Sequence, residues 1–140
     1  MLPFLLAHAG HADWRLALDR CLEKLSLDAG AEVPPDYALG WCYLTDAFAD
    51  AAESILVALK TQLPGIAWVG TVGIGIAASG VEYIDEPALV LMLGPLPRDS
   101  FRLFSGRQPL RGGEGGFDAH TALVHADASM PDLQELLPEL

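Results

Sequence analysis

The chain has 140 residues, of which 51% are hydrophobic and 8% aromatic, and its formal net charge is −11. This length and apolar content exclude a disordered chain and predict a single domain over residues 1–140. The strong negative charge argues against nucleic acid and against a membrane surface as partners, because phosphate backbones and anionic lipids repel an acidic surface.

The first third of the chain carries a strand pattern, a helix pattern and a second strand pattern. A short apolar run predicts a strand at residues 4–7, and apolar side chains at helical spacing predict a helix at 12–27. A longer apolar run at 37–44 then predicts a buried strand. Cys21 and Cys42 lie within these apolar patterns and form no C-x-x-C motif, which is typical of buried free thiols in a reducing, cytoplasmic compartment.

A second helix is expected after residue 44, with Thr45-Asp46 as its cap and Pro64-Gly65 at its end. A third strand follows at 66–70, so the order is β-α-β-α-β, which favours parallel pairing. The uncharged stretch 61–81 is long enough for a membrane span. Its five glycines suit turns and buried strands better than a helix in lipid.

The remaining half predicts an antiparallel hairpin, a loop and a final strand and helix. The hairpin is expected to pair residues 74–80 with 88–93, because the polar connection between them has no room for a helix. A loop at 98–116, a strand at 121–126 and a helix after Ser129 follow. The fold class is therefore α/β (mixed α+β), with one mixed sheet and helices packed on it.

A glycine-rich segment follows the third strand and supplies the candidate ligand-binding residues, which are Gly70, Thr71, Val72, Gly73 and Gly75. Glycines permit a ligand to approach backbone N–H groups closely. A dinucleotide fingerprint is excluded because a further strand pattern, and no helix, follows. The alternative is purely structural: such glycines more often serve tight turns or close strand packing.

Two further groups of residues are candidates for binding a ligand. Four of the arginines lie in the 98–116 loop; solvated charge is the simplest interpretation, and an anion clamp that includes Arg107 and Arg111 is the alternative. His8 and His11 flank the first strand-to-helix junction, where they can cap or line the helix start, or one of them can ligate a haem iron. No G-x-S-x-G motif or evident cysteine–base pair is present, so we expect no enzyme activity and no cofactor other than the haem alternative.

An ordered set of segments resembles the N-terminal domain of the FIST family. These segments are residues 69–75, 79–83 and 87–92, Leu96-Pro97, the opening helix with Asp13-Trp14, and residues 122–127. Thr71 and Val72 stand where the family has small polar residues, and no acidic residue follows Gly75. Because the family's domain continues with further strands, the resemblance implies a truncated or short version of it.

The resemblance implies a sensory domain that binds small molecules such as amino acids and signals to proteins such as histidine kinases or cyclases. Two alternatives come from other branches of the family: a haem-dependent nitric oxide sensor and a protein-interaction scaffold. We also expect a homo-oligomer, because the strand at 121–126 would leave an edge that recruits a second copy of the chain.

Overall fold

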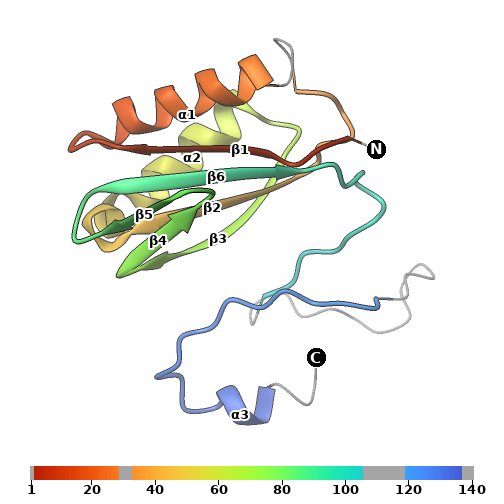
Figure 1. Cartoon of the computed structure of the whole chain (residues 1–140). Helices are drawn as coiled ribbons and strands as arrows, with labels where there is room; N and C mark the ends of the chain where they lie inside the picture. Colours follow the sequence, from red (N-terminus) through yellow and green to blue (C-terminus); the bar gives the residue numbers. More distant parts are fainter. Residues whose placement is uncertain (1, 29–32, 106–118, 137–140) are drawn as a thin grey trace. The chain divides into compact units, whose positions relative to one another are not determined.

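The computed structural model describes residues 2–28, 33–105 and 119–136, and the chain forms two compact units that divide after Ser100. The first unit contains a four-stranded sheet, a two-stranded sheet and two α-helices, which confirms the mixed α/β class (Figure 1). Its elements in chain order are β1 (Leu5–Gly10), α1 (Trp14–Asp28), β2 (Leu39–Thr45), the 3₁₀ helix η1 (Asp46–Ala51), α2 (Ala52–Gln62), β3 (Ala67–Gly73), β4 (Gly75–Ala78), β5 (Val81–Ile84) and β6 (Ala88–Gly94).

The four-stranded sheet has the order β1-β6-β2-β3, with β6 antiparallel to both of its neighbours. Strands β2 and β3 are parallel, as the β-α-β pattern predicts. Strands β1 and β2 run in the same direction but do not pair, because β6 lies between them. The last strand of the unit is therefore at the centre of the sheet, and β1 and β3 form its edges.

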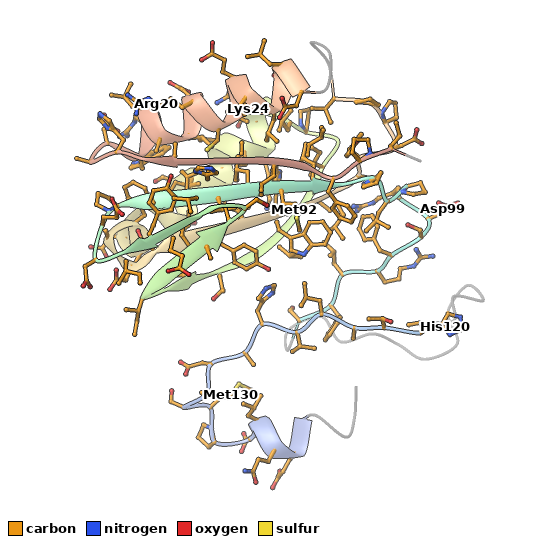
Figure 2. The ribbon with its side chains drawn as sticks, in the orientation of Figure 1. Arg20, Lys24, Met92, Asp99, His120 and Met130 are labelled. Carbon is orange, nitrogen blue, oxygen red and sulfur yellow. The ribbon has the colours of Figure 1, made fainter. Side chains whose placement is uncertain are left out.

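One face of this sheet packs against α1 and α2 and forms the hydrophobic core. Alternate residues of the strands point to this face, among them Ala7 of β1, Leu91 of β6 and Leu44 of β2. Leu18 of α1 and Ile55 of α2 meet them, each at most 1% exposed. The polar side of α1 lies outward, where Figure 2 labels Arg20 and Lys24.

The opposite face of the sheet is partly covered by the β4–β5 hairpin (Figure 1). Met92, labelled in Figure 2, belongs to this face, as does Val90, which is only 3% exposed. Tyr83 of β5 lies over Gly10: a Cβ built on that glycine would be 3.2 Å from the tyrosine ring. The hairpin thus buries a second, smaller apolar layer.

The pairing of residues 74–80 with 88–93 that the sequence predicts is wrong. Residues 75–78 pair instead with 81–84, inside the stretch expected to be a polar connection, and 88–94 join the main sheet. The two-residue connection at Ser79 and Gly80 closes the hairpin because Gly80 adopts a φ of +81°. The described residues consequently form two sheets and not one.

The predicted cap of the second helix is also wrong in its chemistry. Thr45 occupies the N-cap position of η1 but makes no side-chain bond to the helix. Its hydroxyl instead accepts a hydrogen bond of 2.9 Å from the backbone N–H of Ala88. Thr45 is completely buried, and this contact ties β2 to the start of β6.

The second unit is described over residues 101–105 and 119–136. It contains a short helix, α3 (Leu133–Leu136), close to the predicted position. The strand predicted at 121–126 is absent from the described residues: this segment has no ladder partner, and Leu123 is 59% exposed. An apolar run becomes a strand only where another strand pairs with it. The expectation of a single domain over 1–140 stays a prediction.

Candidate functional site

Gly70 marks an irregular point in the edge strand β3. It pairs with Cys42 of β2 and has a φ of +156°, a conformation that residues with a Cβ rarely adopt. A Cβ built there would lie 1.8 Å from the carbonyl oxygen of Cys42. No larger residue fits, so this glycine sets how closely β3 and β2 approach.

A partly open cavity of about 340 Å³ lies beside Gly70, between α2 and the paired strands β2 and β3. The strands contribute Cys42, Leu44 and residues 68–72, and α2 contributes Ala52, Leu56 and Leu59. The lining is largely apolar and, among the residues that the structure describes, includes no charged side chain. Its volume lies within the range of about 300–1,000 Å³ that is typical of small-molecule sites.

Trp68 lines this cavity and is only 9% exposed. It pairs with Gly40, where a Cβ would lie 2.6 Å from the indole ring, so glycine at this position leaves room for the tryptophan. The indole Nε1 is buried and has no hydrogen-bond partner, the one such side-chain atom found among the described residues. A buried N–H without an acceptor is energetically unfavourable.

Cys42 also lines the cavity, and burial raises the pKa of its thiol from 9.0 to about 12, with a smaller contribution from Cys21. Burial raises the pKa of Cys21 to about 12 as well. Both thiols therefore stay protonated at neutral pH. Because the thiolate is the nucleophilic form, Cys42 acts here as a small apolar wall residue.

A second hollow, of about 220 Å³, lies where β3 meets the β4–β5 hairpin and is lined by Tyr43, Thr71, Gly73, Gly75, Ile76 and Ala77. The candidate residues of the glycine-rich segment are therefore divided between two places. Gly70, Thr71 and Val72 line the larger cavity, whereas Thr71, Gly73 and Gly75 line the smaller one. Arg107 and Arg111 lie outside the described residues.

The two candidate histidines make hydrogen bonds to other parts of the fold and are not among the residues that line either cavity. His11 Nδ1 accepts a hydrogen bond of 2.9 Å from the backbone N–H of Asp13, at the start of α1. A hydrogen bond of 2.7 Å joins His8 Nδ1 to Tyr83 Oη, so His8 ties β1 to the hairpin. Across the described ranges, no three His, Cys, Asp or Glu side chains gather as a metal site would require.

The sequence pointed to the glycine-rich strand but not to the other walls of the cavity. Ala52, Leu56 and Leu59 are at the helical spacing of a core face, and nothing in that pattern separates a cavity wall from ordinary packing. The one sequence feature that indicates a cavity on this helix is the small Ala52 among larger apolar residues, since a small residue on a core face leaves space. Trp68 gave no signal, because an unpaired N–H depends on its three-dimensional surroundings.

Comparisons of this chain with protein families, with curated proteins and with solved structures find no match. Within the described part of the chain, no helix combines the length and the apolar character needed to cross a bilayer.

Proposed function

We propose that this chain is a non-enzymatic, cytoplasmic sensory domain that binds a small molecule in the cavity between α2 and β3. The observation that carries the proposal is the cavity itself, with its volume of about 340 Å³ and its position beside Gly70, Thr71 and Val72. The sequence pattern also predicts these three residues as ligand contacts. The protonated thiol of Cys42 supports a binding role over a catalytic one.

The location of the cavity suits a sensor because its two walls belong to different elements. Leu56 and Leu59 come from α2, which also packs on the core, and residues 68–72 come from an edge strand. A ligand held between them would contact both elements and favour one relative position of helix and strand. Such a shift could be transmitted to a signalling protein; histidine kinases or cyclases are the partners that the FIST resemblance implies.

A thermal-shift screen tests this function. Neutral metabolites, amino acids and small organic acids are added to the purified full chain, and a ligand present at about 100 times its Kd should stabilise the native state by about 2.7 kcal/mol. For a unit of this size that corresponds to a rise in Tm of roughly 10 °C.

Two variants on α2 assign the effect to the cavity. Ala52→Leu adds bulk to the cavity wall and should abolish the ligand-induced rise in Tm, whereas Ser54→Leu adds similar bulk at an exposed position and should leave it intact. If the two variants respond alike, the ligand binds elsewhere. If no compound raises Tm in the wild-type chain, the proposed function is wrong.

A further inference from the structure

Strand β3 has one side without a partner strand. It pairs with β2 on one side, and no described strand pairs with the other (Figure 1). The N–H of Ala67 points toward β2, where it donates to the carbonyl oxygen of Ala38 at 2.9 Å. Because backbone groups alternate along a strand, the N–H and C=O groups of Trp68, Gly70 and Val72 point to the open side. Gly70 and Val72 are exposed, so this edge is available to a further strand.

Helix α2 has a second stripe of side chains beside its core face. Glu53, Leu56, Val57 and Lys60 recur at i, i+3, i+4 and i+7, the spacing of one helix face. Leu56 lines the cavity along β3, so this stripe lies on the β3 side of the helix. Val57 is 59% exposed, and Glu53 and Lys60 are exposed at its two ends. The stripe therefore has an apolar centre between an acidic end and a basic end.

The open edge and the α2 stripe are positioned to meet a second copy of the chain together. The short connection at 63–66 reverses the chain, so α2 runs antiparallel to β3. A twofold axis perpendicular to the sheet at Gly70 brings the β3 strands of two copies side by side and antiparallel. Strands are about 4.8 Å apart, so the α2 helices, each over β2 and β3, are then about 10 Å apart. This is the distance at which helices pack.

In this arrangement the α2 stripe is complementary to itself. The midpoint between Glu53 and Lys60 falls between Leu56 and Val57. In an antiparallel pair of helices, each Glu53 therefore faces Lys60 of the other copy, and the apolar residues meet between these charges. Each chain has a net charge of −11, and salt at 0.15 M screens this general repulsion beyond about 8 Å. The paired charges at the contact lie closer together than that.

We propose that the chain forms a symmetric dimer, in which the open edges of β3 pair antiparallel about Gly70 and the two α2 stripes pack together. The two Gly70 residues then exchange backbone hydrogen bonds, as do Trp68 of each copy and Val72 of the other. The Val72 carbonyl also accepts a 3.3 Å contact from the Thr71 hydroxyl and keeps a second lone pair. The result is one continuous sheet with four strands from each copy. This contact needs no ligand, so it is independent of the proposed function.

Charge reversal on α2 tests the helix contact. Sedimentation of the full chain at several concentrations gives the dimer Kd, which we expect in the micromolar range. Glu53→Lys and Lys60→Glu each place like charges opposite each other and should each raise Kd about tenfold, equivalent to about 1.4 kcal/mol. The double variant Glu53→Lys/Lys60→Glu restores opposite pairs at the wild-type net charge, so its Kd should return to within about threefold of the wild-type value.

A matched control separates this contact from the general charge of the chain. Glu23→Lys changes the net charge as Glu53→Lys does, but at an exposed position on α1. It reduces the repulsion between two acidic chains and touches no proposed contact. Its Kd should therefore equal the wild-type value or fall slightly below it.

A proline on β3 tests the strand contact. Val72→Pro removes an N–H that points to the open side and leaves the hydrogen bonds to β2 in place, as an edge strand tolerates. The variant should fold, as its circular dichroism and Tm will show, and should sediment as a monomer at concentrations where the wild-type chain is a dimer.

Three results would overturn the inference. The first is a wild-type chain that sediments as a folded monomer at every concentration. The second is a dimer that Glu53→Lys weakens no more than Glu23→Lys does, and the third is a dimer that survives Val72→Pro, because the contact then lies elsewhere. If Val72→Pro does not fold, the charge-reversal series decides alone. None of these results bears on ligand binding, which the thermal-shift screen tests separately.

Discussion

Two glycines shape the candidate site because they have no side chain. Gly40 lacks a side chain that would collide with Trp68, and Gly70 lacks one that would collide with the Cys42 carbonyl. The first allows a large indole to be buried against β2, and the second keeps β3 close to β2 where the cavity begins. Both positions are on paired strands, where glycine has no general advantage. Their effect on neighbouring groups explains them.

Gly70→Ala is therefore expected to destabilise the chain by about 3 kcal/mol or more, because the new Cβ meets backbone and the φ is unfavourable. Two control glycines separate these causes. Gly80 has a φ of +81° in open space, so Gly80→Ala should cost about 1 kcal/mol. Gly65 has neither constraint, and Gly65→Ala should be neutral or slightly stabilising. Urea denaturation gives the three values; equal losses at Gly70 and Gly80 would show that the clash with Cys42 is relieved.

At the residue scale the sequence predicts part of the site. A glycine-rich run after a strand is visible in one dimension, so Gly70, Thr71 and Val72 could be nominated. The same pattern predicts Gly73 and Gly75 as ligand contacts, yet these two residues line the smaller hollow beside β4. Successive side chains of a strand point to opposite faces, so neighbours in sequence are divided between two surfaces. Only the position of the helix and of the hairpin shows which surface is hollow.

Among the elements, the β4–β5 hairpin shares no strand pairing with the main sheet and is held to it by side-chain packing. It pairs with itself over eight residues, and Tyr83 anchors it to β1 through His8 and by packing over Gly10. The rings of His8 and Tyr83 lie 5.7 Å apart. A two-stranded hairpin is marginally stable alone, so its order depends on its packing against β2 and β6 and on this anchor.

Tyr83→Ala should free the hairpin and lower stability by about 1–2 kcal/mol, because both the ring packing and the hydrogen bond are lost. Tyr83→Phe keeps the ring and should cost under about 1 kcal/mol. Glu82→Ala, on an exposed neighbouring residue, serves as control. Hydrogen exchange at residues 75–84 should accelerate in Tyr83→Ala alone. Unchanged protection there would mean that other contacts hold the hairpin.

The sequence pattern does not predict which segment pairs with β4. Residues 81–84 contain Glu82 and run directly into Asp85, Glu86 and Pro87, so this stretch resembles a polar connection. Residues 88–94 are apolar at nearly every position because both of their faces are covered, which is typical of a central strand. The continuous apolar run of β6 predicts that this strand is buried. It does not predict that β6 pairs with β1, which lies more than 70 residues earlier in the sequence. Element types follow from local sequence, and pairing follows from tertiary contacts.

At the scale of the molecule, the core between sheet and helices contains two thiols whose protonation is linked to folding. Cys21 of α1 is 1% exposed, and Cys42 lines the cavity on the same side of the sheet. Each pKa is raised to about 12 because burial disfavours the thiolate. In the unfolded chain the same groups lose their protons near pH 9.0.

Stability should therefore fall as the pH rises from about 9 to about 12. In this window the unfolded chain releases thiol protons that the folded chain retains, so rising pH favours unfolding; below pH 9 the contribution is fully present. Tyr43 and Tyr83, whose pKa values burial also raises, add to the fall above pH 10. The double variant Cys21→Ala/Cys42→Ala should show a shallower decline in urea midpoints across this range. Identical slopes would exclude the thiols as its source.

The central position of β6 delays strand pairing while the chain is synthesised on the ribosome. Leu5 pairs with Leu93, so β1 can pair only after a strand that is synthesised 88 residues later. Until residues 88–94 have left the exit tunnel, β1 has no strand to pair with and β2 can pair only with β3. At about 5–20 residues per second, this interval lasts several seconds. During it the backbone groups of β1 that later bond to β6 have no ladder partner, and ribosome pausing before Ala88 would lengthen that interval.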